Sequence, residues 1–426
     1  MTGKKSARHE HHTWEIGQLP PTIRAHSLAK HRVIQSYLER YVAVLTSNIR
    51  SEQLRLTLVD GFAGGGLYID DRTKEERPGS PLIMLEAMEA ASVSAQAIRS
   101  KSFDLNVDYF FIEKDPNALT FLKNVLAESR FRQLVDDKVR ILAGEFASHV
   151  EAMVEHVKSK GRSGRAIFVL DQFGYSDVPF PIIRSILKSL PNAEVILTFA
   201  TDSLIDYLSD NEQTHKILER IDLPLPSSTI VSAKNSRDWR RTIQYSLHKQ
   251  IQVKSEAKFY TPFFIRSSDA HRDFWLIHLS GHYRARDVMV GLHWKESTHF
   301  AHYGGSGLRM LGYDQTRDEK ITNQPQLPGF YFDETALVSS QEELLEQLPT
   351  RLHQFKDGIS FEDFFAHLTN ETPVTLEIMK SVLNELAVAG VLHVKDQSGS
   401  TQRRAGIVHA SDILKPSRQK RLFRQE

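Results

Sequence analysis

Hydrophobic residues in the first half of the chain fall into short runs that are apolar almost throughout. Between these runs lie longer stretches in which apolar positions recur every three or four residues. The runs are typical of strands covered on both faces, and the stretches are typical of helices. Strands are predicted at residues 54–60, 107–113, 138–143, 165–171 and 193–199. Helices are predicted at residues 28–45, 79–99, 115–129, 146–160 and 179–190. This alternation predicts a parallel sheet with helices on both faces, which is a doubly wound, Rossmann-like α/β domain.

Two of the predicted helices begin with residues that favour a helix start. Ser80 precedes Pro81, and Asp115 precedes Pro116. Serine and aspartate are good N-cap residues, and proline is favoured at the first helical position. The sequence therefore predicts Ser80 and Asp115 as N-caps.

The pattern changes after a further strand at residues 273–279 and a helix at residues 282–295. Residues 296–335 are rich in glycine, proline and polar side chains, which is typical of a linker or mobile loop. A helix at 340–356, a capping box at Ser360 and Asp363, and a helix at 374–389 that ends at Gly390 come next. Strands at 391–396 and 403–410 complete the order of a small winged-helix-like α+β domain. We therefore predict these divisions: a flexible N-terminal tail at 1–24, an α/β domain at 25–300, a linker at 301–338, a winged-helix-like domain at 339–415 and a basic tail at 416–426.

Composition narrows the class of protein. The 426 residues contain 40% hydrophobic and 25% charged residues, and the formal net charge is +1. These are ordinary globular values, so any surface that binds nucleic acid must come from a local excess of positive charge. The absence of cysteine excludes disulfides and cysteine-based metal sites within this chain. No run approaches the roughly 18 apolar residues that span a bilayer, and we expect a cytoplasmic protein with no membrane contact.

Candidate ligand-binding residues stand at the ends of the predicted strands, where doubly wound sheets bind their ligands. Asp60 ends the first strand and Glu113 ends the second. Asp60 is followed by a turn of small residues and Phe62: Gly61, Phe62, Ala63, Gly64, Gly65 and Gly66. Glycines let a backbone approach a ligand closely, an acid at Asp60 suits an amino group, and Glu113 suits a ribose diol. S-adenosylmethionine has both groups, whereas the pyrophosphate of NAD is a poor neighbour for Asp60. A turn cap, a solvated strand end and structural glycines are the alternative explanation.

The fourth strand ends in the sequence DQFGY, residues 171–175. In methyltransferases that act on amines, an acid here orients the target nitrogen and an aromatic ring stacks on the base. Asp171 is therefore the candidate orienting group, and Phe173 and Tyr175 are candidate stacking residues. The alternative is a capping aspartate that precedes a buried phenylalanine.

Five motifs, taken in order, make the chain resemble the three-Cys-motif partner (TcmP) family of methyltransferase-like proteins. They are VDGFAGGGLY, RPGSPLIMLEA, FFIEKDPNA, FVLDQFGYSDVPFPIIRSIL and HYRARDVMVGLHW, and Ala29 to His31 (AKH) fit as well. The resemblance covers roughly residues 25–300. It implies a class I methyltransferase fold, an S-adenosylmethionine cofactor, and a radical-SAM-type partner protein that supplies cysteines. It also implies that Asp60, Gly61, Phe62, Ala63, Gly64 and Gly66 line the methionine side of the cofactor, that Glu113 binds the ribose, and that Asp171 lies on the acceptor side. Gln172 stands where the family usually has proline.

Basic residues gather near the C-terminus. The candidates for phosphate contact are Arg403, Arg404, Lys415, Arg418, Lys420 and Arg421. Together with a winged-helix order, this excess predicts contact with nucleic acid. The alternative is a solvated basic tail beside a protein-docking domain.

Three functional hypotheses follow. The first is an S-adenosylmethionine-dependent methyltransferase that acts on a base nitrogen of tRNA or DNA together with a partner protein. The second is a non-catalytic, nucleic-acid-binding partner of a radical-SAM-type three-Cys-motif enzyme. The third is a winged-helix transcriptional regulator, which leaves most of the chain unexplained.

Overall fold

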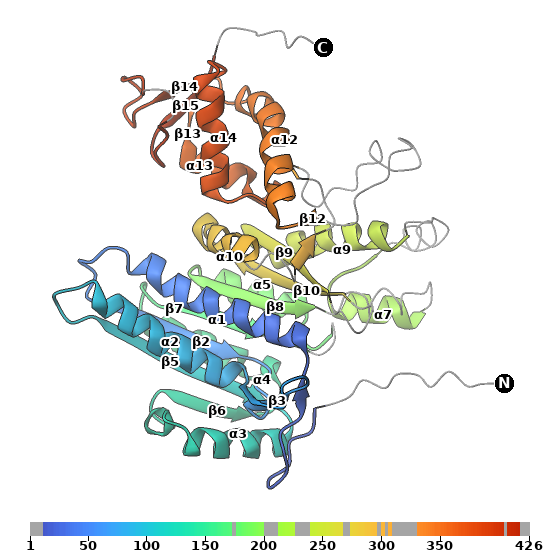
Figure 1. Cartoon of the computed structure of the whole chain (residues 1–426). Coiled ribbons are helices and arrows are strands. Elements are labelled where there is room, and N and C mark those ends of the chain that lie inside the picture. The colour runs from blue at the N-terminus through green and yellow to red at the C-terminus, as the bar shows by residue number, and fades with distance from the viewer. Residues whose placement is uncertain are drawn as a thin grey trace. The chain divides into compact units, whose positions relative to one another are not determined.

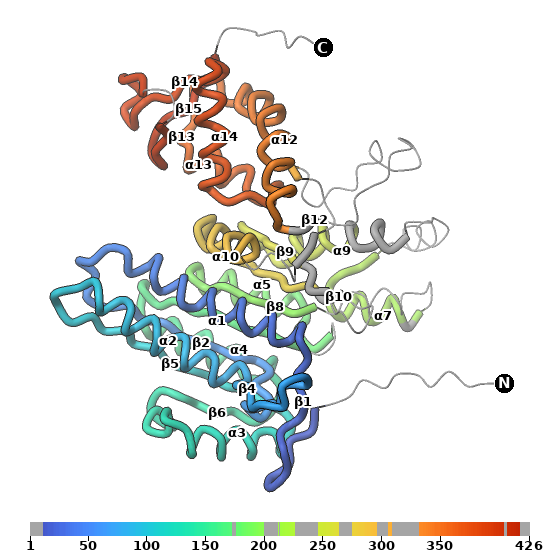
Figure 2. The backbone as a smooth tube through the Cα atoms, viewed as in Figure 1, coloured from blue at the N-terminus to red at the C-terminus, as the bar shows by residue number. Residues whose placement is uncertain are grey.

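The structure is a computed structural model that describes most of the chain. The described residues are 12–172, 176–199, 212–225, 239–266, 273–295, 300–302, 306–308, 330–403 and 407–417. Figure 2 traces the backbone from blue at the N-terminus to red at the C-terminus. The chain divides into two compact units, residues 1–172 and 173–426. Each unit is described by itself.

The first unit alternates strands and helices as the hydrophobic pattern predicts. In chain order its elements are β1 (Thr22–Ile23), α1 (Ala25–Leu45), β2 (Gln53–Asp60), β3 (Leu67–Asp70), β4 (Glu76–Pro78), α2 (Ser80–Ala97), β5 (Asp104–Glu113), α3 (Pro116–Glu128), the short 3-10 helix Arg132–Leu134, β6 (Val139–Ala143), α4 (Phe146–Ser159) and β7 (Arg165–Leu170).

Four strands of this unit form a parallel arrangement in the order β7-β2-β5-β6. Chain order reverses between β2 and β7, because β2 is followed by β5 and β6 on one side and by β7 on the other. Right-handed crossovers then place α2 and α3 on one face and α4 on the opposite face. Helices α1 and α2 run side by side, as Figure 1 shows. The predicted parallel strands covered by helices are confirmed for this part of the chain.

The two predicted helix caps have different outcomes. Asp115 is the N-cap of α3, and its side chain accepts a hydrogen bond from the backbone N–H of Asn117. The prediction for Ser80 is wrong, because Gly79 is the N-cap and Ser80 is the first residue of α2. The Ser80 hydroxyl lies near the carboxyl group of Asp60 and lowers its pKa. Ser80 is therefore not the residue that starts the helix.

Part of the segment in which the sequence predicts an N-terminal tail contributes to this unit. Strand β1 pairs with β3, which pairs with β4, to form a small separate sheet. Trp14 is buried, and its indole Nε1 donates to the carbonyl of Leu67 at 2.9 Å. Residues 12–24 thus pack against the turn that follows β2.

The second unit contains a set of antiparallel strands and the C-terminal helices. In chain order its described elements are α5 (Phe180–Ser189), β8 (Ala193–Phe199), α7 (Glu212–Arg220), α9 (Trp239–Ser255), β9 (Phe259–Arg266), β10 (Asp273–Ser280), α10 (Tyr283–Lys295), β11 (Phe300–His302), β12 (Phe330–Tyr331), α12 (Glu334–Leu352), β13 (Ile359–Ser360), α13 (Phe361–Leu368), the short 3-10 helix Thr369–Glu371, α14 (Leu376–Val388), β14 (Leu392–Lys395) and β15 (Ile413–Pro416). Strands β8, β10, β9, β11 and β12 pair in that order, and each pair is antiparallel.

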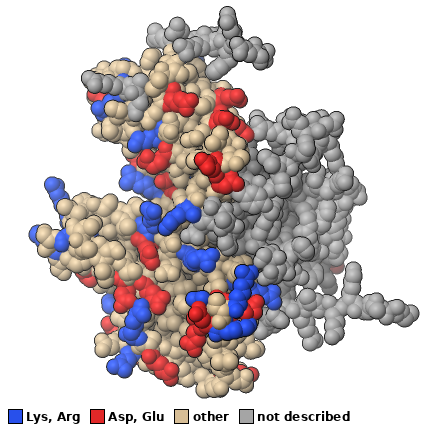
Figure 3. All heavy atoms as spheres, viewed as in Figure 1, with Lys and Arg blue, Asp and Glu red and all other residues tan. Residues whose placement is uncertain are grey.

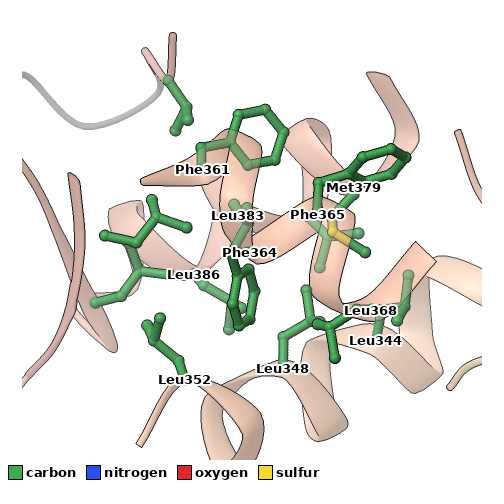
Figure 4. Close-up of a cluster of buried hydrophobic side chains, with 14 of the residues drawn as sticks. Leu344, Leu348, Leu352, Phe361, Phe364, Phe365, Leu368, Met379, Leu383 and Leu386 are labelled. Atoms are coloured by element: carbon green, nitrogen blue, oxygen red, sulfur yellow. The ribbon is translucent and has the colours of Figure 1, made fainter. Parts of the chain in front are cut away.

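The C-terminal elements have the helix, helix, helix, hairpin order of a winged helix. Helices α12, α13 and α14 pack around a core of aromatic and aliphatic side chains that includes Phe361, Phe364 and Phe365 (Figure 4). Ser360 caps α13 by accepting from the N–H of Asp363 at 3.0 Å, and Gly390 ends α14 with φ +71°, as predicted. The last strand was predicted at residues 403–410, but it lies at Ile413–Pro416. The prediction failed because the connection between the two strands is longer than a five-residue turn.

Helix α10 holds the turn between α13 and α14. The Arg286 side chain is fully buried, and its guanidinium donates to the carbonyls of Val374, at 2.9 Å, and Thr372. Trp294 donates to the carbonyl of Pro373, and the carboxylate of Asp287 accepts from the N–H of Leu376 at 2.7 Å. Charged groups at such bonds make them stronger than neutral ones. The first turn of α14 is therefore bound to α10.

No helix among the described residues is both long and apolar enough to cross a membrane.

Candidate functional site in the N-terminal unit

The turn after β2 lies between the ends of the strands on either side of it. Gly61 N–H donates to the carbonyl of Val169 in β7, and Ala63 N–H donates to the carbonyl of Ile112 in β5, both at 2.9 Å. These bonds fix the turn at the carboxyl ends of three neighbouring strands. Because chain order reverses between β2 and β7, this is the position at which open α/β sheets bind ligands.

The side chain of Asp60 is fully buried. Its Oδ1 accepts from the N–H of Phe62 at 3.1 Å, and Oδ2 has no well-aligned donor among the described residues. Burial raises the pKa of Asp60 to about 7, and the charges of Asp171 and Glu113 add to this rise, while the nearby Ser80 hydroxyl and the Phe62 N–H oppose it. Asp60 therefore keeps its proton to a much higher pH than an ordinary aspartate does.

Glu113 connects the end of β5 to the glycine turn. Its Oε2 accepts from the N–H of Gly64, and its Oε1 accepts from the N–H of Asp115, both at 2.8 Å. The sequence predicted that Glu113 and the glycine turn serve one site, and the structure places them in contact. Each oxygen of a carboxylate has two lone-pair positions, so both oxygens can accept a further hydrogen bond.

Asp171 follows β7 and forms an ion pair with Lys30 from α1. The Lys30 side chain is 11% exposed and that of Asp171 is 25% exposed. His31 is buried beside this pair, and burial together with the Lys30 charge lowers its pKa to about 4, although Asp171 opposes this effect. The imidazole is therefore neutral at pH 7. Gln172 is also buried, whereas the predicted stacking residues Phe173 and Tyr175 lie outside the described residues.

The glycines of the turn have packing reasons of their own. A Cβ on Gly65 would lie 2.2 Å from the indole of Trp14, and one on Gly61 would lie 2.7 Å from Leu170. Gly66 has φ +83°, and a Cβ there would lie 2.8 Å from Leu122. Contacts under 3 Å cannot persist, so a side chain at any of these positions would displace its neighbour. The glycine pattern thus reflects internal packing, and the carboxyl groups carry the stronger signal for a ligand.

Sequence reasoning missed three residues of this site. Trp14, on the predicted tail, meets the ring of Tyr68 edge-on, with ring centroids 5.4 Å apart. Burial raises the pKa of the Tyr68 hydroxyl, and the charges of Asp171, Asp60 and Glu113 raise it further, so the hydroxyl stays neutral. Lys30 was noted only as part of the AKH motif. No residue spacing could have paired Lys30 with Asp171, because 141 positions separate them.

The structure describes two of the residues that the sequence predicts to contact nucleic acid, Arg403 and Lys415. Arg403 pairs with the buried carboxylate of Asp412 at 3.0 Å, so this arginine supports the fold of the winged helix. Lys415 lies on β15, directly opposite His393 of β14. Three of the four strand positions that flank these residues point into the core: Leu392, Val394 and Leu414. Arg404, Arg418, Lys420 and Arg421 lie outside the described residues.

The surface of the winged helix is not basic as a whole. Residues 339–415 contain 11 acidic and seven basic residues. The exposed side of α14 carries Glu377 and Glu385, with Lys380 half-buried between them. On the face that Figure 3 shows, Lys and Arg side chains lie among Asp and Glu side chains. The acidic exposed side of α14 is therefore expected to repel a phosphate backbone.

Comparison with known families settles the nature of the C-terminal domain. Residues 312–399 match the family described as the GMT-like wHTH domain. The C-terminal domain is a winged helix. The winged helix predicted from the sequence is thereby confirmed, and domains of this kind commonly bind nucleic acid.

Comparisons with curated proteins and with solved structures support no further assignment. No curated protein matches the sequence. A Legionella pneumophila protein of family DUF519 is 11% identical with a TM-score of 0.34, and the match covers 61% of this chain and 90% of that chain. A possible exported protein from Bordetella parapertussis is 10% identical with a TM-score of 0.23, with 58% and 67% covered. At such TM-scores, these likenesses carry no argument about fold or function.

Replacing Gly65 tests the packing of Trp14. Gly65→Ala places a Cβ against the indole and is expected to lower the free energy of unfolding by about 2 kcal/mol, a typical cost of overpacking. In a Trp14→Leu background, the same change should cost much less, because the ring that it strikes is gone. Urea denaturation of the four proteins gives the coupling energy between the two positions. An equal cost of Gly65→Ala in both backgrounds would show that Trp14 does not lie on the turn.

The raised pKa of Asp60 predicts a specific dependence of stability on pH. The unfolded chain ionises Asp60 near pH 3.8, but the folded chain retains the proton to about pH 7. Between these values the folded state binds more protons, so its stability falls as pH rises and then levels off above pH 7. Asp60→Asn removes this loss. Its stability relative to the parent should increase by up to roughly 4 kcal/mol between pH 4 and pH 8.

Chemical denaturation at pH 4, 6 and 8 measures this difference. Asp137→Asn, at an exposed position, is the matched control for the loss of a charge. A stability difference that is the same for Asp60→Asn at all three pH values would mean that Asp60 is ionised throughout, and the account of its burial would be wrong.

Proposed function

We propose that residues 12–172 bind S-adenosylmethionine and that the protein is a methyltransferase-type enzyme that acts on nucleic acid, at a base nitrogen of tRNA or DNA. The observation that carries this proposal is the convergence of Asp60, Glu113 and Asp171 at the ends of β2, β5 and β7. Their charges act on one another across the point where strand order reverses. A site with this placement and these groups fits a ligand with both a cationic end and a ribose.

The topology of each unit supports a class I methyltransferase fold. In the first unit the order β6-β5-β2-β7 corresponds to the order 3-2-1-4 of a doubly wound sheet. In the second unit, β10 runs antiparallel to both β8 and β9. The resemblance to three-Cys-motif partner proteins points in the same direction.

The residues present fit the cofactor. Glu113 retains a lone-pair position on each oxygen after its two backbone bonds, and these positions can accept the two hydroxyls of a ribose. Asp60 offers a buried carboxyl group that an amino group would keep ionised. Gly61, Phe62, Ala63, Gly64 and Gly66 form the turn that joins these two acids. When bound, S-adenosylmethionine supplies an electrophilic methyl group on a sulfonium centre.

Asp171 is the group of this chain that would act on the acceptor. An ion pair with Lys30 favours its ionised form, and an ionised carboxylate orients an acceptor N–H by accepting its hydrogen bond. The same carboxylate can take the proton that the nitrogen loses on methylation. Holding the acceptor in line with the methyl donor would supply most of the rate.

The wing of the winged helix is the surface best suited to nucleic acid. His393 and Lys395 on β14 alternate with buried residues, so they share the outer face of the hairpin with Lys415 of β15. The exposed side of α14 is acidic, and its first turn is bound to α10. We therefore infer that phosphates contact the hairpin rather than α14.

One observation favours the second function, a non-catalytic, nucleic-acid-binding partner. The ammonium group of Lys30 already forms an ion pair with the Asp171 carboxylate, so an acceptor amine would have to share that carboxylate. In this function the cofactor site is retained for binding alone. A radical-SAM-type protein of the kind that the family resemblance implies would then perform the chemistry.

Binding of the cofactor tests the proposal directly. Calorimetry of the full chain with S-adenosylmethionine is expected to show binding, and Glu113→Gln should weaken it about tenfold, because a neutral amide accepts weaker hydrogen bonds from a ribose. Glu128→Gln is the same substitution at an exposed position of α3 and should leave the affinity unchanged. If neither the cofactor nor S-adenosylhomocysteine binds at millimolar concentration, the proposal is wrong.

Transfer of a labelled methyl group to total tRNA and to duplex DNA separates the two functions. At saturating cofactor, Asp171→Asn should lower kcat by 10²-fold or more, the usual contribution of a positioned acid–base group. The double variant Lys395→Glu/Lys415→Glu should raise KM for the nucleic acid and leave kcat unchanged. Cofactor binding without transfer to either acceptor would favour the non-catalytic function.

A further inference from the structure

The proposed cofactor site contains a built-in positive charge that comes from a different part of the chain. Asp60, Glu113 and Asp171 are three carboxyl groups at the ends of adjacent strands, and Lys30 pairs with one of them. Lys30 lies on α1, ahead of all the strands that form the site. The length of its side chain and its position on α1 place an ammonium group where a ligand cation would otherwise pair with Asp171.

The neighbours of Lys30 keep this part of the site suited to a cation. His31 is 7% exposed, its Nδ1 has no hydrogen-bond partner among the described residues, and its ring centroid lies 6.2 Å from that of Tyr68. Burial and the Lys30 charge keep His31 neutral at pH 7. The histidine therefore adds no second positive charge beside Lys30.

Aromatic rings complete the surroundings. Tyr68 lies beside His31 and meets Trp14 edge-on at 5.4 Å. Tyrosine and tryptophan rings attract cations through their π faces, and quaternary centres are recognised in this way. Carboxylates and aromatic rings together favour an onium ion, such as a sulfonium or an ammonium, over a neutral group of the same shape.

We propose that Lys30 is a specificity-determining residue of this site. It neutralises Asp171 in the absence of ligand and thereby sets how strongly the site prefers a cationic ligand to its neutral analogue. This inference rests on the proposed binding of S-adenosylmethionine, whose sulfonium carries a positive charge that S-adenosylhomocysteine lacks. With Lys30 in place, the sulfonium shares Asp171 with the ammonium and is repelled by it. Without Lys30, this repulsion is absent, while the Asp171 carboxylate still attracts the sulfonium.

The test is calorimetry of Lys30→Met in the full chain at pH 8, with three ligands. S-adenosylmethionine and sinefungin are cationic at the centre of interest, and S-adenosylhomocysteine is neutral there. Methionine preserves the length and apolar stem of lysine, so packing is retained while the charge is removed. The preference for each cationic ligand over S-adenosylhomocysteine should rise roughly tenfold, as removal of a like charge a few ångströms away allows.

Lys30→Arg is the matched control, because it keeps the charge and should leave the preference within about twofold. Lys30→Gln, a second neutral variant, should reproduce the increase if Lys30→Met fails to fold. A merely structural role predicts that both neutral variants weaken all three ligands equally, and this result would overturn the inference while leaving cofactor binding intact. If the parent protein binds none of the three ligands, the proposed function itself fails.

Discussion

The hydrogen bonds that join the turn after β2 to its two neighbouring strands are the constraint on which the N-terminal unit depends. Gly61 is tied to β7, and Ala63 is tied to β5. With both ends of the turn fixed, Gly64 reaches Glu113, and Gly65 forms the surface on which Trp14 packs. A side chain on Gly61 or Gly65 would break one of these contacts. The positions of Asp60 and Glu113 relative to each other therefore depend on the backbone of one short turn.

The charged groups of this site do not stabilise the folded state, and this argues that they have a functional role. A buried aspartate with a pKa near 7 weakens the folded state at neutral pH, and a neutral asparagine would hold Phe62 equally well. The Lys30–Asp171 pair is also mostly buried, and such pairs regain little more than their desolvation cost. Departures from local stability of this kind concentrate at binding and catalytic sites.

The parts of the structure that could be predicted from sequence are those that local pattern controls. Apolar runs located β2, β5, β6 and β7, Asp115 marked a helix start, and Gly390 marked a helix end. Ser80 misled because the helix already includes this residue, and the preceding Gly79 is the N-cap. Trp14 and Lys30 could not be placed because their partners are fixed by tertiary contacts. The glycine run could be recognised, but its main cause, the indole of Trp14, could not.

The attachment of the winged helix to α10 limits how this domain can bind a partner. In many winged helices the start of the third helix is free to enter a groove of DNA. Here Arg286, Trp294 and Asp287 bind the backbone at that position, and a buried arginine that loses its carbonyl partners is costly. The acidic side of α14 adds a repulsive charge. Binding through α14 would therefore require both the loss of these bonds and the approach of like charges, whereas binding through the β14–β15 hairpin requires neither.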